Sequence, residues 1–298
     1  AFLLREIMVE PPTLLTSTAA ETAAAWDGVS GQAAGSESYG VTPWASMTYG
    51  EGKAFYGLNT FTSESSNLSI GGDTLVDSKL LLGLAISYDT SDSVHTGGSA
   101  LGFQGSDGYT IAPYMGYLIS NNMLVDLTAG YADIENNIFD SVGISSVDSE
   151  RVFVEANLNY FTMFGSDVEL SASAGILWAE EDTDAYVSAN SGALAASSNE
   201  LTQAKLGVNL TKTAGKFTPY ASLYYNYDID TDSPFVSAGC TEAVGCYDVT
   251  NDKDDFFASL GSSYQIDNGV SAGFEMQTRF GREYSDEVNF AANIRVDM

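Results

Sequence analysis

The chain has 298 residues, including 29 Gly and 17 Tyr but only 6 Pro, a length that suits one large β domain or two small ones. Its 11 Lys and Arg stand against 40 Asp and Glu, and the formal net charge of -29 argues strongly against a nucleic-acid partner, whose phosphates require Lys and Arg. The sequence has no run of about eighteen apolar residues, so it predicts no transmembrane helix.

Residues 1–38 differ from the rest of the chain, because they are rich in Ala and lack any alternation of apolar and polar residues. Two consecutive prolines can open a helix in this segment, and Thr16 can cap one. We therefore expect a helix over residues 16–26 that ends before Gly28. The alternative for this segment is a poorly ordered tail.

Segments of alternating apolar and polar residues run from residue 39 to the end of the chain. Because side chains alternate across a strand, about ten residues with this pattern predict a strand with one apolar and one polar face. The segments are 39–49, 54–62, 78–88, 108–119, 123–133, 151–162, 168–178, 201–211, 217–228, 256–266, 270–280 and 286–298. The sequence thus predicts an all-β protein of about 12 strands.

The last segment, 286–298, indicates how these strands are arranged. Its apolar residues, such as Phe290 and Ile294, fall on one face, whereas Asn289 and Arg295 fall on the other. In an open sheet this terminal strand would be an exposed apolar edge, which proteins avoid. A barrel removes the edge by pairing the last strand with the first, and alternating segments of roughly ten residues are typical of outer-membrane barrels.

The connections between the segments have two lengths. Short turns are expected at 50–53, 120–122, 165–167, 214–215 and 267–269, and long connections rich in Asp, Ser and Gly at 89–107, 134–150, 179–200 and 229–255. Short turns on one side and long loops on the other are the layout of a transmembrane antiparallel up-and-down β-barrel, with the short side periplasmic. The connection 63–77 is an exception, because it is long yet falls on the short side.

A soluble β-sandwich is the alternative fold, but segments of ten or more residues exceed the five to six that are usual for soluble strands. Aromatic residues at segment ends favour the membrane barrel, because Tyr and Trp gather at membrane interfaces. These residues are Tyr88, Tyr117, Tyr131, Trp178, Tyr225 and Tyr227. We expect two parts, an N-terminal linker with a pore helix (1–38) and a transmembrane barrel (39–298).

Charged residues on the polar faces of these strands are expected to point into the lumen, because a charge facing lipid costs several kcal/mol near the midplane. They are Lys79, Asp126, Arg151, Glu155, Glu169, Lys205, Glu275, Arg279 and Arg295. Such an interior could form a wet pore or hold a threaded segment by ion pairs. Alternatively, the charges simply pair with one another across the barrel.

The lumen of about twelve strands is too wide for side chains alone to fill. We therefore expect the helix over 16–26 to lie inside the barrel and substantially block it. Its small Ala residues permit close approach to the wall, and Trp26 closes the segment. Glu21 and Asp27 could pair with the basic residues of the wall.

The two cysteines, Cys240 and Cys246, lie close together in a polar stretch, and an oxidising compartment would let them form a disulfide. The alternative, a metal or redox pair, is disfavoured because no His or third Cys is nearby.

Asp228, Asp230 and Asp232 follow the spacing that opens a calcium-binding loop, but Ser233 replaces the required Gly and no bidentate Glu follows. We expect a solvated acidic loop, with weak binding of divalent ions as the alternative.

The sequence predicts neither an enzyme nor a cofactor. The sole histidine, His95, falls in an expected long loop without a recognisable catalytic motif around it. The sequence also lacks the G-x-S-x-G element of hydrolases. An isolated loop histidine is usually just solvated.

Several runs of the sequence resemble one family of outer-membrane proteins. They are WASMTYGEGKAFYGLNTF (44–61), the Gly71-Gly72-Asp73 turn, KLLLGLAISYDTSDS (79–93) and GYTIAPYMGYLISNNMLVDLTAGYA (108–132). In order and spacing they look like the C-terminal β-domain of autotransporters, which carry out type V secretion, and the resemblance covers 39–298. It implies a 12-stranded barrel in the bacterial outer membrane, with a helix before the first strand lying in the pore.

The resemblance also implies a function and partners. The β-domain would carry or display an N-terminal passenger at the cell surface, surrounded by outer-membrane lipid and lipopolysaccharide. The barrel-assembly machinery would read the terminal strand, where Met298 stands in place of the usual Phe or Trp. Members that cut themselves inside the barrel use an Asn-Asn junction in the helix; the first Asn here is Asn59, so this cleavage is not expected. The alternative function is a small cation-preferring pore, suggested by the acidic loops.

Overall fold

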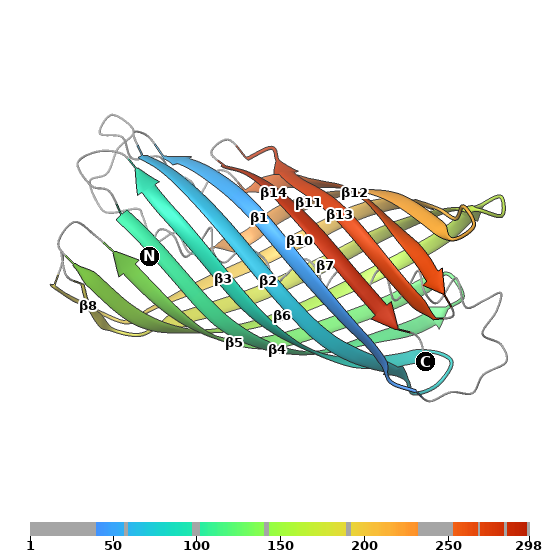
Figure 1. Ribbon diagram of the computed structural model, residues 1–298, viewed down its shortest axis with the longest axis horizontal. Coiled ribbons are helices and arrows are strands. Elements are labelled where there is room, and N and C mark those ends of the chain that lie inside the picture. Colours follow the sequence, from blue (N-terminus) through green and yellow to red (C-terminus); the bar gives the residue numbers. More distant parts are fainter. Residues whose placement is uncertain are drawn as a thin grey trace.

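The computed structural model describes residues 40–56, 59–96, 102–139, 143–188, 192–231, 253–267, 269–282 and 285–296. Within these residues, twelve antiparallel strands form one closed barrel (Figure 1). They are β1 (Thr42–Tyr56), β2 (Asn59–Leu75), β3 (Leu80–Thr96), β4 (Gly102–Ser120), β5 (Met123–Phe139), β6 (Ile144–Phe164), β7 (Val168–Thr183), β10 (Ser197–Lys212), β11 (Phe217–Thr231), β12 (Asp254–Asp267), β13 (Val270–Phe280) and β14 (Ser285–Val296). The predicted transmembrane all-β barrel is thereby confirmed.

The barrel has an up-and-down order, because each strand pairs with its neighbours along the chain. β14 pairs with β1 and closes the barrel, with Arg295 opposite Trp44. Two short strands between β7 and β10, β8 (Tyr186–Ser188) and β9 (Gly192–Leu194), form a separate ribbon. In the described ranges, no helix has the length and apolar character needed to cross a membrane.

The first hairpin differs from the sequence prediction, in which residues 50–53 form a turn and 63–77 a long connection. Residues 50–53 lie inside β1, and β2 continues to Leu75. The glycine at position 50 does not mark a turn. It lies within the strand, where a Cβ would collide with the side chain of Asn289 on β14. The connection from β2 to β3 is short and begins with a bond from the Val76 amide to the Leu80 carbonyl, so the expected exception disappears.

The long connections are also shorter than predicted, because the strands continue well into them. β3 and β4 remain paired up to His95 and Gly102, and β5 and β6 up to Phe139 and Ile144. These extensions carry Ser, Thr, Asn and Asp on both faces, so the alternation of apolar and polar residues does not reveal them. The strands have 11 to 21 residues, whereas crossing a membrane takes about 9–11. The barrel wall therefore extends beyond the membrane.

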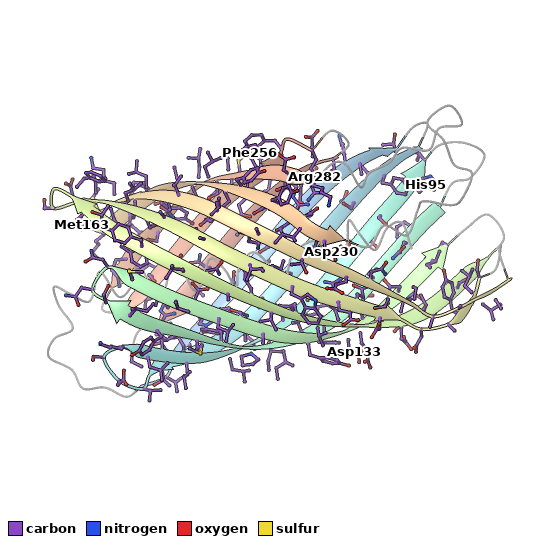
Figure 2. All side chains as sticks on the ribbon, turned by 180° about the vertical axis from the view of Figure 1, so that it is seen from behind. His95, Asp133, Met163, Asp230, Phe256 and Arg282 are labelled. Atoms are coloured by element: carbon purple, nitrogen blue, oxygen red, sulfur yellow. The ribbon has the colours of Figure 1, made fainter. Side chains whose placement is uncertain are left out.

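The two faces of the wall have the predicted characters. On β3, Leu82, Leu84 and Ile86 are exposed on the outer face, whereas Leu81 and Ala85 are buried on the inner face. Figure 2 shows side chains projecting around the outside of the barrel, with Met163 at the end of the short turns and His95 toward the opposite end. Apolar side chains on the outer face suit a wall that is surrounded by lipid.

Large aromatic rings on the inner face lie over glycines of neighbouring strands. A Cβ at Gly83 would collide with the ring of Tyr114, and one at Gly130 would collide with the ring of Phe153. The same relation holds for Trp44 over Gly71, Tyr224 over Gly207 and Tyr220 over Gly261. An aromatic ring that covers a glycine packs flat on the sheet and shields its backbone, which strengthens a strand position that glycine alone would weaken.

We predict that Gly130→Ala destabilises the barrel by about 1–3 kcal/mol, because its methyl group would push the buried Phe153 ring off the sheet. Gly102→Ala is the matched control, since a Cβ there meets its nearest neighbour at 3.7 Å, an ordinary contact. The measurement is the urea midpoint of unfolding of the barrel in detergent micelles. Equal midpoints for the two variants would contradict the role of the ring.

Candidate functional site: the lumen of the barrel

The inner face carries most of the charged residues that were expected there. Asp126, Glu155, Glu275 and Arg279 are buried, and the Arg151, Lys205 and Arg295 side chains are only 14, 12 and 18% exposed. Glu169 is half-buried near the turn that precedes β7. These residues face the interior because strand alternation puts every second side chain on the side of the barrel away from lipid.

The expectation for Lys79 is corrected, because it lies exposed in the turn between β2 and β3 and not on a strand. The carboxylate of Asp77 accepts hydrogen bonds from the Lys79 and Leu80 amides, at 2.7 and 2.9 Å. An Asp side chain that accepts hydrogen bonds from the backbone amides of the following residues stabilises a turn. β3 therefore begins at Leu80 and leaves Lys79 outside the lumen.

A cluster of polar groups joins β5, β6 and β10 in the lumen. The Asn157 amide donates to Asp126 Oδ1 at 2.7 Å and to Glu155 Oε1 at 3.3 Å, and the Asn159 amide donates to Asp126 Oδ2 at 2.5 Å. Lys205 Nζ lies 3.4 Å from Glu155 Oε1. Two buried carboxylates are thus held by two amides and one cation, which satisfies most of their acceptor capacity.

A second ion pair joins neighbouring strands on the same side of the barrel. Arg151 on β6 donates from Nε and Nη2 to Glu181 Oε2 on β7, at 2.9 and 2.6 Å.

A further buried carboxylate, that of Glu275 on β13, accepts a hydrogen bond from the Tyr220 hydroxyl of β11 at 2.5 Å. It also accepts a hydrogen bond from the Gln277 amide.

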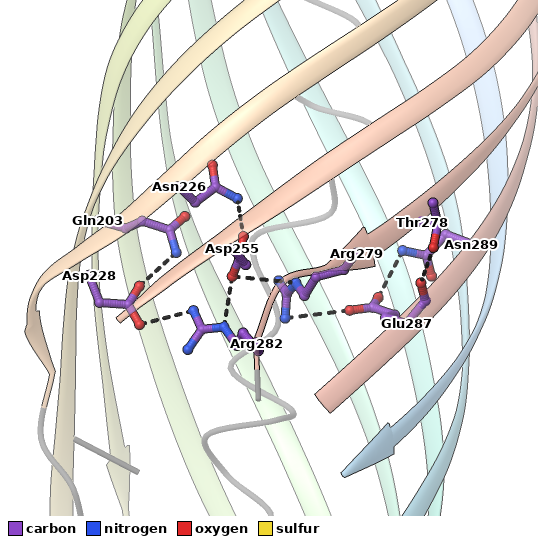
Figure 3. A network of polar contacts seen from close by, with 9 residues as sticks. All are labelled: Gln203, Asn226, Asp228, Asp255, Thr278, Arg279, Arg282, Glu287 and Asn289. Atoms are coloured by element: carbon purple, nitrogen blue, oxygen red, sulfur yellow. Dashed lines mark hydrogen bonds and ion pairs between the residues drawn. The ribbon is translucent and has the colours of Figure 1, made fainter. Parts of the chain in front are cut away.

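The largest charged network lies on the inner wall of β10 to β14 (Figure 3). Arg282 donates from Nε to Asp255 Oδ2 at 2.7 Å and from Nη2 to Asp228 Oδ2 at 3.0 Å. The Gln203 and Asn226 amides donate to the same two carboxylates, at 2.8 and 2.9 Å. Both carboxylates are almost fully buried, so the guanidinium offsets the cost of keeping two negative charges away from water.

Arg279 extends this network from β13 to β14. Its guanidinium lies 4.6 Å from the centre of the Phe257 ring and 3.5 Å from Glu287 Oε2. Glu287 also accepts the Asn289 amide at 2.8 Å. After β13, Gly281 has a φ of 104°, a conformation that favours glycine, and the bend directs Arg282 into the barrel.

The prediction of a solvated acidic loop is wrong for Asp228, which lies on β11 and is 1% exposed, because the strand continues to Thr231. Other residues of these ion pairs have no signal in the sequence. Asp255, Glu181 and Asp73 also lie on extended parts of strands, and Arg282 follows a strand, so the period-two pattern gives no signal for them. Within the described residues, no group of three His, Cys, Asp or Glu side chains could hold a metal ion.

The remaining candidates from the sequence have different outcomes. His95 lies on β3 and not in a loop, and its ring stacks on Phe61 with centroids 4.5 Å apart. The pore helix with Glu21, Trp26 and Asp27, and the cysteines Cys240 and Cys246, lie outside the described residues.

A cavity inside the barrel is lined by a continuous run of strands, from β13 and β14 through β1 to β6. Small residues such as Gly50, Ser65 and Asn67 form part of its lining. Arg151 and Arg279 contribute two positive charges to it. Polar walls around an open space provide a path or a binding surface for a polar chain or for water.

The fold and its polar lumen agree with the comparisons to known proteins. The family model described as the autotransporter beta-domain matches residues 43–277. The chain belongs to the autotransporter β-domain family. The family is one of transporter barrels and not of enzymes. A comparison of the sequence with curated proteins gives no significant match.

Solved autotransporter structures share the fold at low sequence identity. The translocator domain of NalP from Neisseria meningitidis has a TM-score of 0.72 at 14% identity, covering 96% of this chain and 99% of that one. The transport unit of AIDA-I from Escherichia coli has a TM-score of 0.71 at 14% identity, covering 86% and 90%. The β-domain of the Bordetella autotransporter BrkA has a TM-score of 0.66 at 14% identity, covering 87% and 99%.

Membership of this family establishes the general role of the chain. It is the outer-membrane translocator and anchor domain of an autotransporter. An autotransporter β-domain also implies an N-terminal passenger as its partner.

We predict that Arg282→Gln destabilises the barrel by about 3 kcal/mol, because Asp228 and Asp255 would remain buried without their shared guanidinium. Lys212→Gln is the control, because it removes an exposed charge at the end of the barrel that carries the short turns. It should change stability by less than about 0.5 kcal/mol. Both values come from urea unfolding in micelles. A loss for Arg282→Gln no larger than that of the control would refute the structural role of the network.

Proposed function

We propose that the lumen of this translocator holds residues 1–38, which link the barrel to its passenger, and that a helix over 16–26 blocks the pore once secretion is complete. The observation that carries this proposal is the closed twelve-stranded wall with a polar cavity inside it. A barrel of this width needs either a filling segment or water. A short Ala-rich helix, about ten ångströms across, is slim enough to enter.

The pairing of charges on the wall supports a role in holding a segment without trapping it. Arg282 lies between two carboxylates, and Arg151 and Lys205 each face one. Charges satisfied by the wall offer a passing chain only weak competing sites, since each wet pair is worth about 1 kcal/mol or less. Glu21 and Asp27 of the linker would then contribute little individually, and shape and confinement would provide much of the hold.

The outer face supports the expected membrane partners. Tyr49, Tyr88 and Trp178 project from it, and their polar atoms donate to acidic side chains of the same face, as in the 2.9 Å bonds from Tyr88 to Asp107 and from Trp178 to Glu200. Aromatic rings with polar tips suit the boundary between lipid and water. We place lipopolysaccharide against this surface, and the barrel-assembly machinery at β14 during insertion. The domain itself performs no catalysis.

Conductance in a planar bilayer tests the plug. The full chain should conduct poorly, whereas a shortened chain that starts at Ser38 should open clearly larger channels, because the cavity would then fill with water. A synthetic peptide of residues 1–38 added to the shortened chain should reduce its conductance again. A scrambled peptide of the same composition is the control and should leave the conductance unchanged.

The second candidate function, a small cation-preferring pore, gives a different result in the same experiment. It is favoured by the cavity and by the excess of 40 acidic over 11 basic residues. Equally large conductance from the full and shortened chains, with a reversal potential that indicates cation selectivity, would reject the proposed plug in favour of the pore. The anchoring role in the outer membrane is independent of this outcome.

A further inference from the structure

The junction between β1 and β14, which we call the seam, is where the two ends of the barrel meet. The other junctions join barrel strands that follow one another along the chain. The seam instead pairs residues from opposite ends of the chain, such as Trp44 and Arg295. Closing a loop of this length costs more chain entropy than closing a hairpin. The seam is therefore the junction whose closure is opposed most strongly by chain entropy.

One ion pair on the inner face crosses the seam. Arg295 on β14 reaches past β1 to the carboxylate of Asp73 on β2, with Nη1 3.0 Å from Oδ2 and Nη2 2.7 Å from Oδ1. The Asp73 side chain is only 2% exposed and that of Arg295 18% exposed. A bidentate ion pair of this kind, with two parallel N–H···O hydrogen bonds, is stronger and more directional than a single contact between charges. It connects β14 to β2 across β1, which lies between them in the sheet.

Two aromatic residues extend this contact. Asp73 Oδ2 also accepts the Tyr114 hydroxyl of β4 at 2.9 Å, and the Tyr114 oxygen accepts the Trp44 indole N–H of β1 at 2.8 Å. Both aromatic side chains are buried, as is Asp73. We call these four residues, Trp44, Asp73, Tyr114 and Arg295, the seam cluster. It joins β14, β1, β2 and β4 through side chains alone.

We propose that the seam cluster controls the opening and closing of the barrel at the junction of β1 and β14. While the seam is closed, Arg295 neutralises the buried Asp73. Separation of β14 from β1 removes the guanidinium and leaves the carboxylate in its buried place, which makes opening costly. Conversely, the pair forms only when β14 reaches its final register, so its formation marks a completed barrel. This conformational device does not depend on the proposed plug.

A pair elsewhere in the barrel shows why position matters. Arg151 and Glu181 are as closely paired as Arg295 and Asp73, but they join β6 and β7, which a short turn already connects. Loss of that pair leaves the ends of the chain closed. Arg151→Gln is therefore a matched control for Arg295→Gln, because each removes one guanidinium from a buried carboxylate.

The test is hydrogen exchange of the full chain, folded in detergent micelles and read by mass spectrometry on peptides from each strand. Arg295→Gln should raise the exchange of β1 and β14 amides roughly tenfold or more and leave β6 and β7 unchanged. Arg151→Gln should leave β1 and β14 unchanged. Asp73→Asn is the sharpest variant: although it lies on β2, it should loosen β14 as Arg295→Gln does.

Two results would overturn the proposal. One is exchange at β1 and β14 that is the same in Arg295→Gln and in the unaltered chain. The other is an increase in Arg295→Gln that is spread evenly over all strands, which would indicate general destabilisation. If Arg295→Gln does not fold, Arg295→Lys decides between the same outcomes, because it keeps the charge but loses the two-pronged contact. A selective increase at β1 and β14 supports the seam cluster, and an even increase or none rejects it.

Discussion

Within lipid, a protein backbone must satisfy its own hydrogen bonds, because hydrocarbon offers no partner for an amide or a carbonyl. The pairing of β1 with β14 meets this requirement for a sheet, since it removes both edges at once. Closure also divides the side chains into two environments. The exposed outer residues, such as Leu84 and Phe290, are apolar, whereas charged residues such as Glu155 and Arg279 are buried on the inner face.

The scarcity of basic residues gives the lumen its character. In a chain with 11 Lys and Arg against 40 Asp and Glu, several of the bases lie on the inner wall beside buried acids. Arg282 serves two carboxylates, and Arg295 holds one at the seam. The lumen is thus polar and strongly charged locally, yet its charges are largely engaged by the wall. This arrangement suits a translocator that must let a polypeptide pass without binding it tightly.

The wall also differs around its circumference. The cavity is lined by small residues such as Gly50 and Ser65 together with Arg279, whereas the carboxylates that Arg282 binds lie on β11 and β12, which do not line it. Aromatic rings cover glycines on parts of the inner wall, as Tyr114 covers Gly83. A closed wall, an open space inside it and a seam joined by side chains are the features by which this barrel combines firm anchoring with passage.

The alternation of residues along the chain by itself determined the strands, the barrel, the family resemblance and the inward direction of residues such as Asp126 and Arg279, because lipid imposes period two wherever the wall crosses it. Only the tertiary structure decided the rest. Where strands leave the lipid, both faces become polar, so the pattern could not show that Asp228 is buried or that residues 50–53 continue a strand. Arg282 enters the lumen through a bend after a strand, and Asp73 meets Arg295 only because the barrel closes. Such partners are set by three-dimensional proximity, which local periodicity does not encode.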